Sequence, residues 1–356
     1  MQKRNILLVL VLITMLVMPL TGAFAQDGEE PIVLPEVDPL SVTGDIAIAG
    51  SSTVEPVTIA MAARFNEDGY NGNIAVAETG TSAGFERFCS EGSTDISNAS
   101  RPVKDSEIEN CAAIGRENVL EFYIGIDAVT VAVAEGFPVT ELKRSELIQI
   151  FTGEVTSWGE LNEDWADLGD ISMFIPGVDS GTFDFFGEAV LGTKGDYSTR
   201  EARFDALLAP GPTTSENDFT LVEGIQGTEG AIGFFGFAYY VQNEDTLDAI
   251  AIADDVTNDD DGNFVIIAEE EWEAEGIEYV VPSRETAESG EYMLSRPLFI
   301  YSDASILAEK AHVAAFINYY LSNAPEVVEE EGYFPISTEA LNASKMLWLE
   351  AMGLAE

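Results

Sequence analysis

Short apolar runs alternate with segments of helical periodicity along most of this chain. Three strand-length runs are each followed by such a segment, within the ranges 45–65, 73–89 and 171–191. The first of these helical segments, at 54–66, carries Pro56 in its first turn and an apolar stripe at helical spacing. Strands that alternate with helices are typical of parallel βαβ units. The pattern therefore predicts an α/β fold.

Further segments add detail to this pattern. The apolar run at 121–134 is longer than an ordinary strand of about five or six residues, so it could carry the chain from one lobe to another. The glycine-punctuated aromatic segment at 225–240 is typical of a buried strand. Amphipathic helices are predicted at 142–151 and 304–321. A chain of 356 residues is long enough for two such α/β domains.

Each of the three strand–helix connections is a loop rich in glycine and hydroxyl residues. A helix start leaves its first backbone N–H groups unpaired and carries a partial positive charge, so small residues there let an anion approach. Serine and threonine are also ordinary helix caps, so one such loop is weak evidence. Three in one α/β chain predict a shared oxyanion site. The candidate residues are Ser52, Thr53, Val54, Ser82, Gly84, Ser180, Gly181 and Thr182.

One carboxylate and one guanidinium lie between the second and third loops, in the segment 94–102. Arg101 is one of few cations in the chain, and its guanidinium could donate hydrogen bonds to two oxygens of an oxyanion. A surface ion pair is the alternative for Arg101. For Asp95 the alternative to a site residue is a turn or cap residue.

The charge of the chain narrows the possible partners. It has 64 acidic residues against 16 lysines and arginines, a formal net charge of −48. Such a chain repels nucleic acid and anionic lipid. The acids are spread among apolar residues throughout, which indicates a solvated surface and is consistent with a salty habitat, where salt screens self-repulsion. An anionic ligand would have to be bound by local donors, because the field of the whole protein opposes it.

The first 25 residues have the pattern of an export signal. Lys3 and Arg4 precede an apolar stretch at 6–20, and Ala23-Phe24-Ala25 matches a cleavage site. An uncleaved anchor is the alternative, but the stretch is short of the roughly 20 residues that span a bilayer. We predict a cleaved signal peptide at 1–25, a disordered acidic leader at 26–44, and a periplasmic or extracellular protein.

Two cysteines, Cys89 and Cys111, follow the predicted signal peptide. An isolated pair in an oxidising compartment predicts one disulfide, with two buried free thiols as the alternative. A metal site would need more ligands than these two and His312, the single histidine, can offer. We therefore predict no metal.

Enzymatic motifs are missing from the loops. The G-x-S-x-G nucleophile elbow and the P-loop pattern are both absent, and His312 lies in a predicted helix with no triad context. The sequence predicts a binding protein without a cofactor. A secreted phosphatase-like hydrolase is kept as the alternative.

Six motifs occur in order: GSSTVEP, TGTSAGFERFC, DISNASRPV, IFTGEVTSW, DSGTFDFF and GAIGFFGFAYY. Together they resemble the phosphate-binding proteins that serve Pst-type ABC importers, from residue 45 to the C-terminus. The resemblance implies a two-lobed periplasmic-binding-protein fold of type II, with two crossing hinge segments and a ligand cleft between the lobes. It places lobe one at 45–124 plus 289–356 and lobe two at 125–288. The hinges fall near 124–129 and 288–297.

The resemblance also assigns roles to residues. The loops at 52–54, 82–84 and 180–182 match loops that cradle phosphate, and Asp95 falls where the family places an aspartate in the site. Some members have an arginine before the third loop, where this chain has no cation, so the ion-pairing role would fall to Arg101. Asp95 could accept a hydrogen bond from protonated phosphate but would repel sulfate.

The predicted function is the capture of inorganic phosphate outside the inner membrane and its delivery to the permease subunits of an ABC transporter. We expect a monomer that binds no nucleic acid. A binding protein for another tetrahedral oxyanion, sulfate or molybdate, is an alternative, as is a sensory module without transport.

Overall fold

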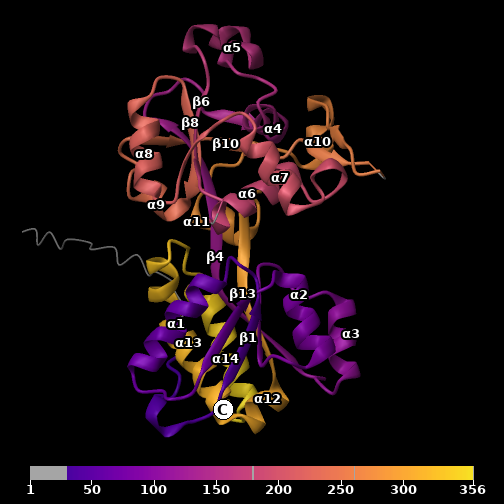
Figure 1. Ribbon diagram of the computed structural model, residues 1–356, viewed down its shortest axis with the longest axis vertical. Helices are drawn as coiled ribbons and strands as arrows, with labels where there is room; N and C mark the ends of the chain where they lie inside the picture. Colours follow the sequence, from indigo (N-terminus) through magenta and orange to yellow (C-terminus); the bar gives the residue numbers. More distant parts are fainter. Residues whose placement is uncertain (1–29, 179, 260, 356) are drawn as a thin grey trace, which may run out of the picture.

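Two α/β lobes are stacked along the long axis of the molecule and joined by two strands that run between them (Figure 1). The structure is a computed structural model that describes residues 30–178, 180–259 and 261–355, so the predicted signal peptide lies outside the described residues. No helix in the described part of the chain is long and apolar enough to cross a membrane. The predicted α/β class is confirmed.

Lobe one is built around the sheet order β2-β1-β3-β13-β4. Its first three strands are parallel, whereas β13 runs antiparallel to both β3 and β4. The strands are β1 (Ile46–Gly50), β2 (Ile74–Glu78), β3 (Ile96–Ala99), β4 (Val119–Ala134) and β13 (Ser295–Asp303). The helices are α1 (Glu55–Glu67), α2 (Thr81–Phe85), α3 (Asp105–Ala113), α12 (Ala304–Glu309), α13 (Ala311–Glu330) and α14 (Thr338–Ala351).

Lobe two continues the same sheet from the second part of β4. Its order is β4-β8-β6-β7, and β9 also pairs with β4. These strands are β6 (Ser172–Pro176), β7 (Thr213–Ser215), β8 (Ala231–Gly236) and β9 (Leu247–Ala249). Two small pairs are β5 (Glu141–Lys143) with β10 (Ala251–Ala253), and β11 (Val256–Asn258) with β12 (Phe264–Ile266). The helices are α4 (Arg144–Thr152), α5 (Trp158–Leu161), α6 (Gly181–Leu191), α7 (Arg200–Leu208), α8 (Asp218–Gly227), α9 (Phe237–Val241) and α10 (Trp272–Glu275), with α11 (Arg284–Ser289) near the junction.

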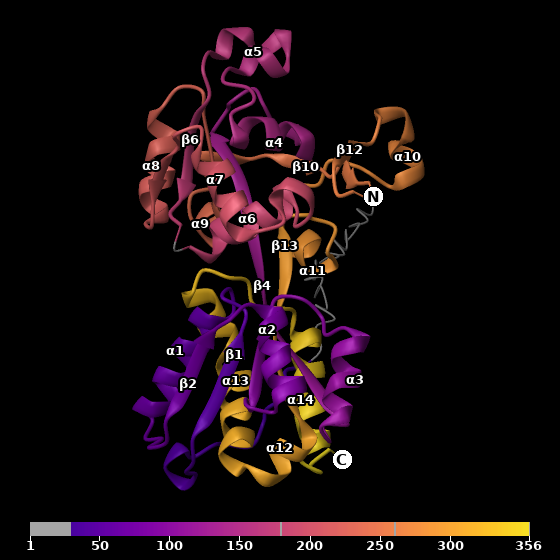
Figure 2. The ribbon, with the colours of Figure 1, turned by 45° about the vertical axis from the view of Figure 1, so that its right-hand side comes forward.

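The strand β4 passes from one lobe to the other, as its unusual length predicted (Figure 2). Its residues up to Ala128 pair with β13, and from Val129 onward they pair with β8 and β9. The hydrophobic cores divide at the same point, because Ala128 packs in the core of lobe one and Val129 in that of lobe two. On the returning strand, Tyr292 and Leu294 still pack in the core of lobe two. The core of lobe two therefore reaches past the predicted boundary at 289, whereas Ala287 before it packs in the core of lobe one.

Two element predictions need correction. The predicted helix 304–321 is two helices, which meet at Lys310, and the second continues to Glu330. The predicted strand within 225–240 is shorter, because that segment contains the end of α8, the strand β8 and the start of α9. Gly230, at φ +70°, makes the turn from helix to strand that a branched residue would resist.

The described part of the leader predicted as disordered, residues 30–44, makes defined contacts with the last helix of the chain. The Asn342 side chain accepts a hydrogen bond from the Ile32 backbone at 2.7 Å, and the Lys345 ammonium donates to the Ile32 carbonyl at 3.0 Å. Both side chains belong to α14 and are buried. Composition did not reveal this, because the polar partners of the extended segment lie at the other end of the chain.

The predicted disulfide between Cys89 and Cys111 is confirmed. Cys89 lies in the π-helical turn Glu86–Glu91, which directly follows α2, and Cys111 lies in α3. Both cysteines are buried in the core of lobe one. The bond therefore ties two helices that stand behind one wall of the region between the lobes.

Candidate functional site

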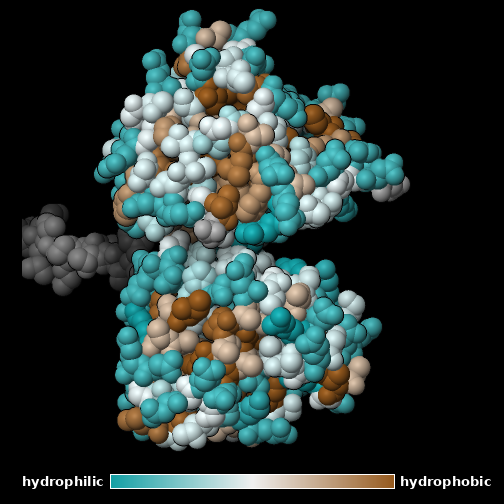
Figure 3. Space-filling view, viewed as in Figure 1, coloured by the Kyte–Doolittle hydropathy of each residue, from teal (hydrophilic) through white to brown (hydrophobic). Residues whose placement is uncertain are grey.

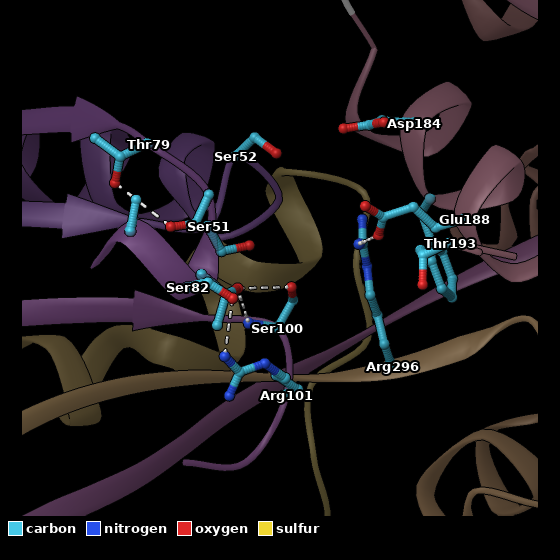
Figure 4. A pocket seen from close by; sticks show the side chains of 14 residues that line it. Ser51, Ser52, Thr79, Ser82, Ser100, Arg101, Asp184, Glu188, Thr193 and Arg296 are labelled. Atoms are coloured by element: carbon cyan, nitrogen blue, oxygen red, sulfur yellow. Dashed lines mark hydrogen bonds and ion pairs between the residues drawn. The ribbon is translucent and has the colours of Figure 1, made fainter. Parts of the chain in front are cut away.

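A cleft separates the two lobes, and the space-filling view shows the molecule notched at this level (Figure 3). Its cavity measures about 660 Å³, more than one small oxyanion needs. Residues of both lobes line it, and Figure 4 shows them facing one another across the gap. The polar side chains that line the cavity are Ser51, Ser52, Thr79, Thr81, Ser82, Ser100, Arg101, Asp184, Glu188, Thr193 and Arg296.

The lobe-one wall forms where parallel strands end and helices begin. Ligands of open α/β sheets bind at this carboxyl edge, because the loops there converge. Ser52 lies in the turn between β1 and α1, and Ser82 lies in the first turn of α2. Gly84 is buried below this wall: a Cβ there would meet the Gly50 Cα at 2.5 Å, so glycine lets α2 approach β1. The structure thus assigns Gly84 to packing and leaves Ser52 and Ser82 facing the cavity.

The starts of α1 and α6 come together across the cleft. A Cβ on Gly181 would lie 3.8 Å from the Thr53 Cα. Within the described residues the Thr53 hydroxyl is buried without a hydrogen-bond partner. The Ser180 hydroxyl accepts from the Thr182 backbone N–H at 3.2 Å and caps α6. An orphaned hydroxyl and two helix starts, where backbone N–H donors gather, therefore lie at one place.

The predicted residues of these two loops have different positions. Val54 precedes the first residue of α1 and its side chain is fully buried in the core of lobe one, so its backbone is what remains for a ligand. Ser180, Gly181 and Thr182 lie at the start of α6, and later residues of that helix line the cavity. The structure therefore brings all three predicted loops to one cleft.

Arg101 lines the cavity but already has partners. Its Nη2 and Nη1 donate to the two Glu107 carboxylate oxygens at 2.7 and 2.9 Å, and Nη2 also donates to the Ser82 hydroxyl at 3.2 Å. Burial raises the pKa of Glu107, but the hydrogen bonds from Arg101 and from the Lys104 backbone outweigh it, so that pKa is lowered. Arg101 thus forms the ion pair that was its predicted alternative, at a position that lines the cavity.

The proposed role of Asp95 in the site does not fit the structure. Asp95 precedes β3 and accepts from the Lys310 ammonium at 2.6 Å and from the Ala47 backbone N–H at 3.1 Å. Ala47 lies near the amino end of β1, whereas the cavity lies beyond its carboxyl end. A strand advances ~3.3 Å per residue, so the length of β3 separates Asp95 from the cleft. Asp95 anchors the break between α12 and α13 instead.

Arg296 is a cleft residue that sequence reasoning missed. It lies on β13 directly opposite Asp127 of β4, and its Nε donates to the Asp127 carboxylate at 3.0 Å. Its guanidinium lies over the Phe185 ring, 4.0 Å from the centroid. Burial raises the pKa of Asp127, and Arg296 opposes that shift. The signal in the sequence was an arginine within an apolar strand, SRPLFIY, which ordinary core packing does not require.

Two acids of α6 line the lobe-two wall and are matched by arginines of α7. Glu188 lies 3.3 Å from the Arg203 Nη2, and Asp184 lies 3.4 Å from the Arg200 Nε. Arg203 is buried, with 4% of its surface exposed. This wall is therefore charged, whereas the opposite wall presents mostly hydroxyl groups.

The single histidine of the chain does not lie at the cleft. His312 lies at the amino end of β1, with its Nε2 3.2 Å from the Asp45 carbonyl oxygen, at the end of lobe one away from the cleft. It cannot act as the base for a serine of the cleft. The described residues include no group of three or more His, Cys, Asp or Glu that could hold a metal ion.

Two α/β lobes, two crossing strands and a polar cleft lined by helix starts define a solute-binding protein of the periplasmic-binding-protein fold. The family model described as a PBP superfamily domain matches residues 38–324. The chain therefore belongs to the PBP superfamily, and the predicted fold is confirmed.

Relatives within this family are similar over most of their length. Protein SphX of Synechococcus elongatus is 36% identical over 303 residues, which cover 83% of this chain and 78% of the relative. The phosphate-binding protein PstS of Staphylococcus saprophyticus is 30% identical, covering 82% and 80%. The crystal structure of a possible phosphate-binding protein from Planctomyces limnophilus is similar with a TM-score of 0.72 at 31% identity, covering 87% and 99%.

Proposed function

We propose that this protein captures inorganic phosphate in the cleft and delivers it to the permease of an ABC importer. The observation that carries the proposal is the convergence of three helix starts, with the unpartnered Thr53 hydroxyl, between the two lobes. Such donors suit an oxyanion, because each helix start supplies backbone N–H groups and partial positive charge. The names of the similar proteins, one a phosphate-binding protein and one a possible phosphate-binding protein, support phosphate as the ligand.

The proposed ligand contacts come from both lobes. Lobe one supplies the loop at 52–54, the Ser82 hydroxyl and Arg101, and lobe two supplies the loop at 180–182. The protein acts as a monomer outside the cytoplasmic membrane, after removal of its signal peptide near Ala25. It is a binding protein and not an enzyme, in keeping with the relatives.

Isothermal titration tests the ligand directly. Protein freed of carried-over anion by unfolding and refolding is titrated with phosphate, arsenate, sulfate and molybdate. We expect phosphate and arsenate to bind and sulfate to compete poorly. Tighter binding of sulfate or molybdate than of phosphate would contradict the proposed ligand, and release of phosphate from a chromogenic ester would contradict a pure binding role.

A cavity lined by both lobes also predicts closure on binding. An anion that contacts both walls favours the state in which the lobes approach, and the hinges lie where β4 and β13 cross between the lobes. Small-angle scattering is expected to give a smaller radius of gyration with phosphate than without it. An unchanged radius in protein shown by titration to bind phosphate would contradict a hinge motion.

A further inference from the structure

Arg296 has a combination of contacts that a purely structural arginine does not need. Its Nε is fixed by Asp127, a carboxylate with 1% of its side chain exposed. The Phe185 ring supports one face of its guanidinium. The arginine side chain itself is 11% exposed, and it reaches the wall of the cavity. The guanidinium is therefore held in one orientation before any ligand arrives.

The outer nitrogens of Arg296 have weak partners. Nη2 donates to the Gly181 carbonyl at 3.4 Å, and Nη1 lies 3.8 Å from a Glu188 carboxylate oxygen, which is beyond hydrogen-bond distance. The contact with Gly181 also places this cation at the start of α6, where backbone N–H groups gather. Charge, fork geometry and helix start thus coincide at one point of the cleft.

Glu188 can leave Arg296 without losing its own compensation. Its side chain is 41% exposed and its other oxygen lies 3.3 Å from the Arg203 Nη2. Arg101, by comparison, already donates to both Glu107 oxygens at hydrogen-bond distance. Of these two cleft arginines, Arg296 is the one whose outer donors are loosely held.

We propose that Arg296 is the principal cationic ligand of the bound oxyanion, that Asp127 positions it, and that Glu188 is the counter-ion which the anion displaces. This inference rests on the proposed function, since it names the residues that hold the same anion. The incoming anion takes the place of Glu188 at the outer nitrogens, and Glu188 stays with Arg203. Because Arg296 lies on a crossing strand and contacts the α6 start, anion binding there acts directly on the junction between the lobes.

Phosphate titrations of charge variants test the proposal. Arg296→Gln is expected to weaken phosphate binding by about 30-fold or more, because the anion loses a desolvated, preoriented charge. Arg296→Lys is expected to lose about 10-fold, since an ammonium keeps the charge but lacks the fork. Glu188→Gln is expected to tighten binding about 3-fold to 10-fold, because the competing carboxylate is gone. Matched controls are Arg87→Gln and Glu201→Gln, which make the same charge changes at exposed positions and should leave the affinity unchanged.

The variants also separate binding from folding. Arg296→Gln leaves Asp127 buried without its cation, so the double variant Asp127→Asn/Arg296→Gln is measured beside it, with circular dichroism and thermal melting on each. If neither folds, Glu188→Gln decides: tighter binding supports the proposal, and unchanged or weaker binding overturns it. Folded Arg296 variants that bind phosphate like wild type would overturn the inference alone. Wild-type protein that binds no phosphate would overturn the proposed function and the inference together.

Discussion

The two walls of the cleft have different chemistry. Lobe one presents hydroxyl groups and helix starts on a sheet edge, and Arg101, its charged residue outside the crossing strands, is held by Glu107. Lobe two presents Asp184 and Glu188 with arginines behind them. A wall of neutral donors needs no rearrangement to receive an anion, whereas carboxylates on the other wall must move away from it. The comparison indicates that lobe one is a preformed cradle and that lobe two adjusts as it closes.

The disulfide behind the lobe-one wall gives the largest expected effect. Replacing Cys89 and Cys111 by alanine removes a cross-link between residues 22 apart, which stabilises by about 3 kcal/mol in the chain-entropy model. We expect a corresponding loss in the free energy of unfolding, measured by urea denaturation under oxidising conditions. Reduced wild type serves as the control and should lose a similar amount. If stability is unchanged, the lobe-one wall does not depend on this cross-link.

Arg101 tests how much the lobe-one wall contributes through charge. Arg101→Ala is expected to weaken phosphate binding about tenfold, or about 1.4 kcal/mol, which is less than replacement of Arg296 costs, because Glu107 keeps Arg101 partly engaged. Isothermal titration measures the loss, and Arg87→Ala is the matched control on the same lobe. If the variant binds phosphate as tightly as wild type, lobe one contributes through its neutral donors and not through the charge of Arg101.

The pH dependence of stability in an Asp218 variant tests the acidic character of lobe two. Burial, with the charge of Glu216, raises the pKa of Asp218 to about 6. A carboxyl group whose pKa is raised on folding stabilises the folded state fully at pH values below its unfolded-state pKa. This contribution is lost as the pH rises through the folded-state pKa of about 6. Asp218→Asn should therefore leave stability unchanged near pH 3.5 and raise it by about 1–2 kcal/mol above pH 6. Urea unfolding at the two pH values measures the difference, and equal effects at both would contradict the shift.

Asp95 gives the smallest expected effect and tests where the lobe-one wall ends. Asp95→Asn removes the charge that pairs with Lys310 but keeps an oxygen for the Ala47 N–H, so about 1 kcal/mol of stability should be lost. The ratio of phosphate to sulfate affinity should not change, because the residue lies outside the cleft. A higher affinity for sulfate relative to phosphate would indicate that Asp95 is a residue of the site after all. Lys310→Gln is the matched control and should cost a similar amount.

Sequence patterns predicted the elements whose signal is local. The long run at 121–134 corresponds to β4, and the helix-start loops lie at the cleft, because strand length and capping residues are read from neighbours in the chain. The position of Asp95 was not readable in this way. Asp95 and Arg101 are close in sequence, but they lie beyond opposite ends of the strand β3. Nearness in a motif therefore does not imply nearness in the site.

Arg296 was missed for a related reason. Its partner Asp127 lies on a strand far away in sequence, and the contact arises only when β4 and β13 pair. The ordered leader has the same cause, since Asn342 and Lys345 at the far end of the chain hold it. A single sequence can show an unusual residue, but it does not identify the partner when the contact depends on long-range pairing.

The split construction of lobe one has a consequence for the order of folding. Its sheet has β13 between β3 and β4. Ser97 of β3 pairs with Tyr301 of β13, so this side of β3 is paired only after β13 has joined the sheet. The core of lobe two comes from one contiguous stretch, from Val129 to Leu294. Contacts distant in sequence form later, because more chain must be ordered to close them. We therefore expect the second lobe to collapse first during refolding, and the lobe that carries the cradle to be completed last.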